Sequence, residues 1–154
     1  MKPTPAGWPR LSTALFYRNP GAAIDWLCRA FGLSVRLRVD GPDGSIVHSE
    51  LTYGEALFMV GGTGRSDPGR ESYQPRLKSP LDLQGANTQT NCLFVDDVDA
   101  HCAQARSQGA VIFREPHTDD YGPDYWCDRS YGAEDLEGHL WWFLQRVRDP
   151  ITAQ

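Results

Sequence analysis

Two side chains with acid–base chemistry, His48 and Glu50, lie two residues apart in one short segment of the chain. Residues 45–52 have the composition and length of a β-strand, and alternate residues of a strand project to the same side of the sheet. An imidazole beside a carboxylate can act as a general acid–base pair or bind a cationic ligand. The same two side chains can instead form a hydrogen-bonded pair without chemistry, and the sequence leaves both interpretations open.

Aromatic side chains are the second group that suggests binding. Concave sites lined by aromatic rings suit planar or apolar small molecules, and a ligand cation gains about 0.5–2 kcal/mol from a ring face. Trp141 and Trp142 are adjacent, so on a strand they cannot both line one face, and part of the aromatic set must pack in the core. Five aromatic residues lie on expected strands, where they could line a binding site or its rim: Phe58, Tyr125, Trp126, Tyr131 and Trp142.

The remaining titratable candidates each have a structural and a functional interpretation. Arg129 can bind a ligand carboxylate, or it can pair with Asp128 or Glu50. We expect His139 to serve a tight turn and His101 to lie on the surface of a helix. A triplet on an expected loop can hold an adventitious metal ion, although loops carry such groups often. It consists of His117, Asp119 and Asp120.

Composition excludes several classes of function. The 154 residues carry a formal net charge of −5 without a long basic run, which argues against a nucleic-acid partner. No apolar run reaches the roughly 20 residues of a membrane span, and the N-terminus lacks the apolar segment of a secretory signal. The four cysteines form no C-x-x-C pair, so we expect no structural zinc and a reduced, cytoplasmic setting. Cys28, Cys92 and Cys102 lie in apolar segments and are expected to be buried.

The first half of the chain predicts one β-α-β-β-β module, residues 11–61. Residues 1–10 hold three prolines and form an arm, in which Trp8 is expected to plug the domain surface. Asn19 and Pro20 begin a helix that ends at Gly32, since a capping side chain and an N1 proline mark helix starts. Strands are expected at residues 11–18, 33–39, 45–52 and 55–61.

The second half repeats the first as residues 88–146. A strand near residues 91–95 precedes a helix that we expect Asp96 to cap and Gly109 to end. Further strands are expected at residues 110–114, 125–131 and 140–145, with a polar loop at residues 115–124. Between the modules, residues 62–87 predict a long linking loop, and residues 147–154 a C-terminal tail. Residues 11–146 are thus expected to form a single α+β domain of two modules that share a core.

The final hairpin carries a family resemblance. The run Arg129-Ser130-Tyr131, followed by Asp135-x-Glu137-Gly138-His139-x-Trp141, resembles the last hairpin of the vicinal oxygen chelate superfamily. That superfamily includes glyoxalase I, extradiol dioxygenases and bleomycin-resistance proteins. Leu136 stands where members usually have proline in the turn. The resemblance covers residues 11–145. It implies an α+β fold of two tandem modules whose open, curled mixed sheets form troughs, in proteins that often dimerise.

The resemblance also places the positions at which metal-dependent members hold their ion. These members use His or Glu on the first and last strand of each module, because imidazole and carboxylate bind divalent metals while leaving sites for substrate oxygens. None of the corresponding side chains here is a competent ligand, so we expect no metal and no other cofactor. The four positions are Ser12, Met59 (or Phe58 after a one-residue slip), Thr90 and Trp142.

The resulting hypothesis is a metal-independent small-molecule binding protein resembling the bleomycin-resistance type. It is expected to be a homodimer that binds an aromatic or cationic ligand, for instance to sequester it. The alternatives are a lyase or isomerase that uses His48 and Glu50, a metal enzyme with a different ligand register, and a dimer whose trough is filled by its own side chains. The expected ligand-binding residues are His48, Glu50, Met59, Trp126, Arg129, Tyr131 and Trp142.

Overall fold

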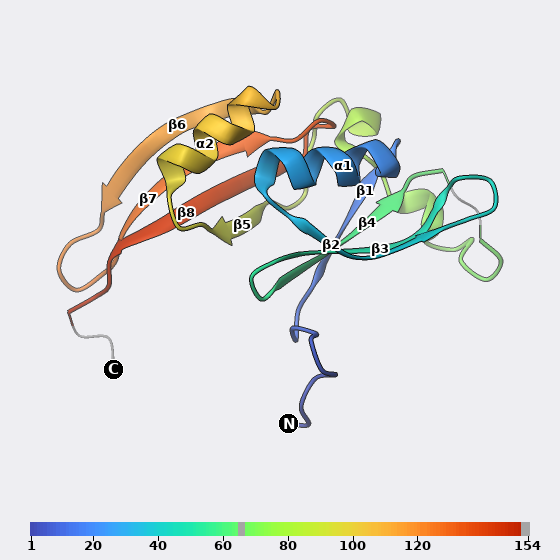
Figure 1. The fold of residues 1–154 in the computed structure, drawn as a ribbon, viewed down its shortest axis with the longest axis horizontal. Helices are drawn as coiled ribbons and strands as arrows, with labels where there is room; N and C mark the ends of the chain where they lie inside the picture. Colours follow the sequence, from blue (N-terminus) through green and yellow to red (C-terminus); the bar gives the residue numbers. More distant parts are fainter. Residues whose placement is uncertain (65–66, 152–154) are drawn as a thin grey trace. The chain divides into compact units, whose positions relative to one another are not determined.

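The computed structural model describes residues 1–64 and 67–151, and it divides the chain into two compact units (Figure 1). The first unit is Met1–Ala86 and the second is Asn87–Gln154. No helix among the described residues has the length and apolar character to cross a membrane.

The first unit is a four-stranded mixed sheet with one helix on one face. The strand order is β1-β4-β3-β2, with β1 parallel to β4 and the other neighbours antiparallel. The helix begins where Asn19 accepts a hydrogen bond from the backbone N–H of Ala22, and it ends at Gly32, whose φ is 71°. The elements are β1 (Thr13–Tyr17), α1 (Pro20–Phe31), β2 (Ser34–Asp40), β3 (Ile46–Tyr53), β4 (Ala56–Gly62) and the short 3₁₀ helices η1 (Gln74–Arg76) and η2 (Pro80–Leu83).

The second unit repeats this arrangement with the strand order β5-β8-β7-β6. β5 is parallel to β8, and the other neighbours are antiparallel. Two β-α-β-β-β modules with open mixed sheets confirm the fold class that the sequence predicts. The elements are β5 (Asn91–Phe94), α2 (Val98–Ser107), β6 (Val111–Asp120), β7 (Cys127–Glu134) and β8 (Leu140–Arg148).

Several boundaries differ from the sequence-based expectation: β7 covers residues 127–134 instead of 125–131, so Tyr125 and Trp126 precede it, and β8 extends beyond residue 145 to Arg148. Residues 115–120 were expected in a loop but belong to β6, which pairs with β7 as far as Asp120 opposite Cys127. The ladder tolerates Pro116 because the proline lies in a register shift between Arg114 and His117, where no regular pairing is needed. Asp97, not Asp96, caps α2 by accepting a hydrogen bond from the backbone N–H of Ala100.

The segment expected to be a linking loop is structured in its second half. Ser79 and Asp82 form a capping box at the start of η2, and Asp82 also accepts a hydrogen bond from Arg18 Nε at 2.7 Å. Gln74 and Ser79 are buried. The lack of hydrophobic periodicity therefore reflects short turns fixed by side-chain hydrogen bonds, with no regular element long enough to show a period.

The hairpin between β7 and β8 is held by one fully buried carboxylate, that of Asp135. Its Oδ1 accepts hydrogen bonds from the backbone N–H groups of Glu137 and His139, both at 3.0 Å. Its Oδ2 accepts one from Trp141 Nε1 at 3.1 Å and lies 3.3 Å from His139 Nδ1. His139 therefore serves the turn, as expected, and the network fixes Trp141 in the core, where its side chain is 0% exposed.

Replacing Asp135 by Ala is expected to lower the free energy of unfolding by about 3 kcal/mol, because buried donors lose their acceptor. Urea denaturation followed by circular dichroism measures the change. Leu136→Ala is the matched control in the same turn, since Leu136 is 38% exposed, and it is expected to cost less than about 0.5 kcal/mol. Equal losses in the two variants would contradict the assigned role of the carboxylate.

Candidate functional site

Strand register assigns each side chain to one of two faces of its sheet. In the second unit, His101 of α2 contacts Tyr131 and Phe143, so these residues lie on the face that the helix covers. Trp142 pairs with Cys92 and Gly132 and lies on the opposite face. We call the side of each sheet away from its own helix the open face.

The same register makes Met59 the counterpart of Trp142. Met59 pairs with Ala14 of β1 and Glu50 of β3, as Trp142 pairs with Cys92 of β5 and Gly132 of β7. Phe58 instead pairs with Leu51, which is 0% exposed, and belongs to the helix-covered face. Met59 is therefore the open-face residue at this level of β4, and the alternative position at Phe58 is ruled out.

The donor set does not fit the metal that the family resemblance implies. Ser12 and Thr90 lie two residues before Ala14 and Cys92, so the four positions match pairwise between the modules. A thioether, an indole and two hydroxyls lack the imidazole and carboxylate donors that hold Fe, Mn, Ni or Zn with open coordination sites. Within residues 1–64 and 67–151, no group of three or more His, Cys, Asp and Glu side chains is arranged to hold a metal ion.

The triplet on β6 is engaged in ion pairs. Asp119 lies 2.9 Å from Arg114 Nη2 and 3.4 Å from His117 Nε2. Asp120 instead receives a hydrogen bond from Arg148 Nη2 at 2.5 Å. The two carboxylates thus have different cationic partners and do not converge with His117 on one point.

An aromatic and guanidinium cluster surrounds Trp142 on the open face of the second sheet. The Phe113 ring meets Trp142 edge-on, with centroids 5.4 Å apart, and the Arg114 guanidinium lies 5.5 Å from the indole centroid. Gly132 makes this packing possible, because a Cβ at that position would come within 2.2 Å of Phe113. The glycine therefore leaves the space that the phenyl ring occupies.

A second cluster on this unit centres on Arg146. Its guanidinium lies 5.6 Å from the Phe94 centroid and 5.9 Å from the Trp126 centroid. Arg146 Nε donates to Asp128 Oδ1 at 2.5 Å, and Asp128 is only 6% exposed. Hydrogen bonds to Asp128 and then Asp149 raise the pKa of Arg146, so it stays cationic at every accessible pH. Phe94 and Trp126 are 54% and 44% exposed, so this cluster offers aromatic surface.

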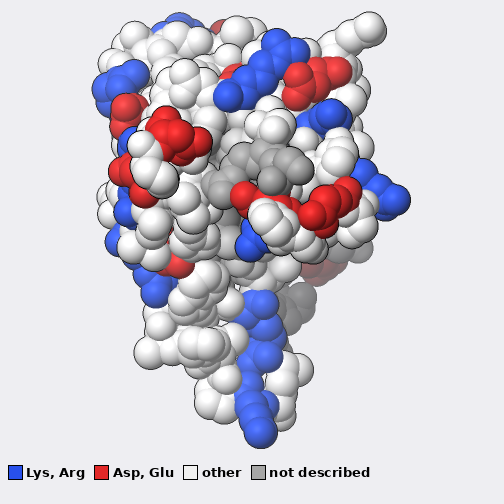
Figure 2. All heavy atoms as spheres, turned by 90° about the vertical axis from the view of Figure 1, so that its right-hand side faces the viewer, with Lys and Arg blue, Asp and Glu red and all other residues white. Residues whose placement is uncertain are grey.

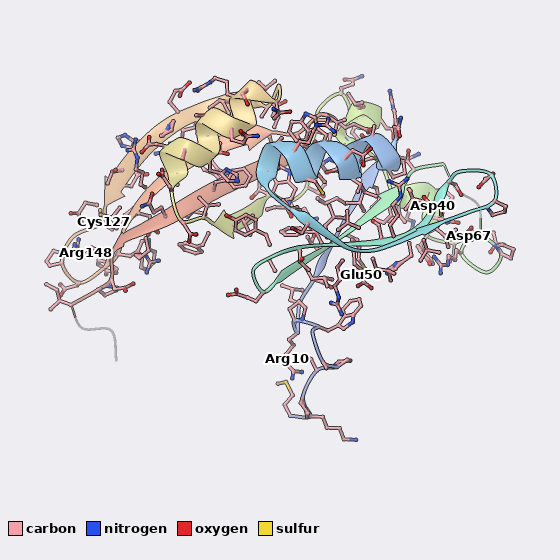
Figure 3. The ribbon with its side chains drawn as sticks, viewed as in Figure 1. Arg10, Asp40, Glu50, Asp67, Cys127 and Arg148 are labelled. Carbon is pink, nitrogen blue, oxygen red and sulfur yellow. The ribbon has the colours of Figure 1, made fainter. Side chains whose placement is uncertain are left out.

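The open face of the first sheet carries a polar cluster. Glu50 is 5% exposed, and its Oε1 lies 3.0 Å from His48 Nε2 while its Oε2 lies 3.4 Å from Arg36 Nε. Figure 3 places Glu50 on the side of the sheet away from α1, toward the N-terminal arm that carries Arg10. The structure thus brings His48 and Glu50 into contact and adds Arg36, which the sequence analysis did not select.

Two of the expected ligand-binding residues lie on the helix-covered face. Arg129 donates to both carboxylate oxygens of Asp99, at 2.6 and 2.7 Å, so the expected pairing with Asp128 or Glu50 is wrong. Tyr131 is 0% exposed, and its hydroxyl lies 2.7 Å from His101 Nδ1. His101 is accordingly half-buried against the sheet and is not the surface residue expected.

Several open-face residues were missed because their segments were misread. The strands there were expected to end at residues 114 and 145, but they run to Asp120 and Arg148. Three residues near these expected ends were therefore not selected: Phe113, Arg114 and Arg146. Cys92, expected to be buried, is exposed, because it shares the open face with Trp142. Strict alternation from the buried Leu93 would have placed Cys92 and Phe94 on this face.

Comparisons with known proteins agree with this architecture. The model of the Glyoxalase/Bleomycin resistance protein/Dioxygenase superfamily matches residues 11–143. An uncharacterised protein of Mycobacterium bovis is 30% identical over 141 residues, 92% of this chain and 86% of its own length. An uncharacterised protein of Mycobacterium tuberculosis strain H37Rv is also 30% identical, with 76% of its length covered.

Solved structures share the fold. TioX from Micromonospora sp. ML1 has a TM-score of 0.64 and 30% identity, over 88% of this chain and 98% of its own. An integron cassette protein of Vibrio cholerae has a TM-score of 0.62 at 15% identity, over 94% and 97% of the two chains. A Burkholderia phytofirmans protein, described as a glyoxalase/bleomycin resistance protein/dioxygenase family enzyme, has a TM-score of 0.60 at 16% identity, over 88% and 98%.

The donor set predicts that divalent metals do not stabilise the protein. Adding Mn²⁺, Fe²⁺, Ni²⁺ or Zn²⁺ to metal-free, untagged protein is expected to leave the melting temperature unchanged, because an ion that binds only the folded state would raise it. Differential scanning fluorimetry and metal analysis by mass spectrometry measure both quantities. A stoichiometric metal content, or a clear rise in melting temperature with one ion, would show that other residues form a metal site.

Proposed function

Because the chain belongs to the Glyoxalase/Bleomycin resistance protein/Dioxygenase superfamily, we propose that it is a metal-independent protein that binds an aromatic or cationic small molecule. The binding surface is the open face of the second sheet. Sequestration is the role that suits binding without chemistry. The observation that carries the proposal is the aromatic cluster where metal-dependent members would present a ligand: Trp142, packed against Phe113 beside Arg114.

The geometry suits a planar ligand. Phe113 and Trp142 present perpendicular rings, so a flat molecule can stack on one and meet the edge of the other. Each such ring contact contributes about 0.5–1.5 kcal/mol beyond the area that it buries. The partly exposed rings of Phe94 and Trp126 extend the apolar surface along the unit.

The charged side chains on this face are paired with one another, so their charges do not exclude a cationic ligand. Arg114 is paired with Asp119, and Arg146 with Asp128, so each cation has a carboxylate partner. A cationic ligand can use the ring faces together with Asp119, whose side chain is 28% exposed. Asp128 is too buried to contribute directly, and it serves to hold Arg146 in place.

Replacing Trp142 by Ala is expected to weaken the binding of a cationic planar dye such as ethidium by about tenfold, through loss of ring stacking. Fluorescence titration measures the affinity, and urea denaturation measures stability in parallel. Tyr73→Ala, which removes an exposed aromatic ring from the first unit, is the control and is expected to bind normally. A loss of about 3–5 kcal/mol in stability without any dye binding to the parent protein would instead identify Trp142 as core filling.

A second candidate function is proton transfer by an enzyme of the lyase or isomerase class. The favouring observation is the position of Glu50, which is buried and paired with Arg36 while it orients His48, whose side chain is 40% exposed. A base held by a third group is the arrangement that general acid–base catalysis uses. In this function His48 exchanges the proton, and Glu50 fixes the orientation of the imidazole.

The substitution His48→Gln tests this second candidate function. Any glyoxalase-type lyase or isomerase turnover found by substrate screening should fall by about 100-fold or more, because glutamine keeps a hydrogen bond to Glu50 but cannot carry the proton. Steady-state kinetics across pH measure the loss. Turnover that survives this change would eliminate His48 as the base. The homodimer implied by the resemblance, and the cytoplasmic location expected from the cysteines and the N-terminal sequence, remain predictions.

A further inference from the structure

The N-terminal arm is ordered against the open face of the first sheet by three separate features. Trp8 N–H donates to Pro5 O at 3.0 Å, which closes a turn. Gly7 adopts a φ of 72°, a conformation that other residues rarely take. Arg36 Nη1 donates to Gly7 O at 2.5 Å, and its guanidinium lies 5.4 Å from the Trp8 ring centroid.

Arg36 is itself held in place, so the arm has a fixed anchor. Its Nε lies 3.4 Å from the buried carboxylate of Glu50, which in turn contacts His48. A Cβ on Gly7 would lie 3.3 Å from Arg36 Nη2, a tight contact that the guanidinium would have to relieve by a small shift. The proline-rich arm is therefore a built part of the first unit, and Trp8 has a place in it (Figure 3).

A cavity of about 580 Å³ lies between the arm and the β3–β4 hairpin. This volume falls within the range of roughly 300–1,000 Å³ that small-molecule sites occupy. Thr52 and Leu57, which form a cross-strand pair on the open face, line it together with Trp8 and two prolines. The one ionisable side chain among the lining residues is that of Glu55.

We propose that this cavity is a second small-molecule site, and that it takes an organic ammonium ion with an apolar body. The apolar body contacts Trp8, Leu57 and the prolines, while the ammonium group pairs with Glu55 and donates to Thr52. Arg36 contacts Gly7 and Trp8 at the edge of the cavity, but its charge is paired with Glu50, which weakens its repulsion of a cation. The lining residues all belong to the first unit, whereas Trp142 belongs to the second.

The arm itself is basic, and a carboxylate that favours an ammonium ligand is present only at the cavity. Lys and Arg side chains lie along the projecting arm in Figure 2, and Lys2 and Arg10 are its basic residues. Arg10 Nη2 donates to Lys2 O at 2.8 Å, which turns that guanidinium toward the outer arm. The carboxylate at the hairpin therefore supplies the charge that selects the ammonium group.

The test compares three probes that differ only in charge type: phenethylammonium, phenethyl alcohol and phenylacetate. Ligand-observed NMR titration of the full chain measures each affinity. Phenethylammonium is expected to bind more tightly than the alcohol, and phenylacetate more weakly than both. Glu55→Gln is expected to lower the affinity for the ammonium by about threefold and to leave that for the alcohol unchanged, as for an exposed charge pair.

Two further variants connect the site to the arm. Trp8→Ala is expected to weaken phenethylammonium about fivefold by removing the ring. Gly7→Ala keeps the ring but forbids the turn, and it is expected to weaken binding similarly, with unchanged circular dichroism of the sheets. Tyr73→Ala is the control for loss of an exposed aromatic ring in the same unit. Absence of binding, unchanged affinity in Trp8→Ala and Glu55→Gln, or loss of binding only in Trp142→Ala would each overturn the proposal.

Discussion

Each four-stranded sheet of this protein has one helix, and a single helix covers one face only. The constraint governs every strand, because alternate residues must satisfy different surroundings. On β8, Trp141 and Phe143 are 0% exposed beneath α2, while Trp142 projects to the other side. The helix therefore packs on one face of each sheet and leaves the open face without helical cover.

The open faces of the two modules carry different side chains at equivalent positions. Glu50 and Gly132 are equivalent, since each pairs with the open-face residue of its last strand. The first module places a carboxylate there and surrounds it with Arg36 and His48. The second removes the side chain altogether, and Phe113 fills the space against Trp142. One backbone arrangement thus supports a polar cluster in one unit and an aromatic cluster in the other.

The fold could be predicted because local sequence signals mark the ends of α1 and the repeat of the first module. Asn19 with Pro20 and Gly32 mark both ends of α1, and the repeat of the first module identifies the second. The length of β6 could not be predicted, because its polar residues and Pro116 are typical of a loop and only pairing with β7 makes them a strand. Asp97 replaced Asp96 as a cap because adjacent aspartates offer the same chemistry one residue apart.

In the candidate site, only the placements that follow from strand alternation could be predicted from the sequence. His48 with Glu50, and Met59 with Trp142, follow from register within and between the modules. The partner of Arg129 did not, because Asp99 is 30 residues away in sequence and comes close only when α2 packs on the sheet. Arg36 was hidden by a register shift in β2 that turns its side chain toward Glu50.

The alternation on β8 also bears on how such a protein can change over time. Two alternate positions of this strand, Trp141 and Phe143, lie in a closely packed core, where most substitutions cost stability. The intervening positions contact little of that core, so they can accept new side chains while the hairpin stays anchored by Asp135. Under the proposed function, residues that would contact a ligand alternate along one strand with residues that stabilise the fold. Open-face residues of this strand can therefore change during evolution while its core residues stay the same.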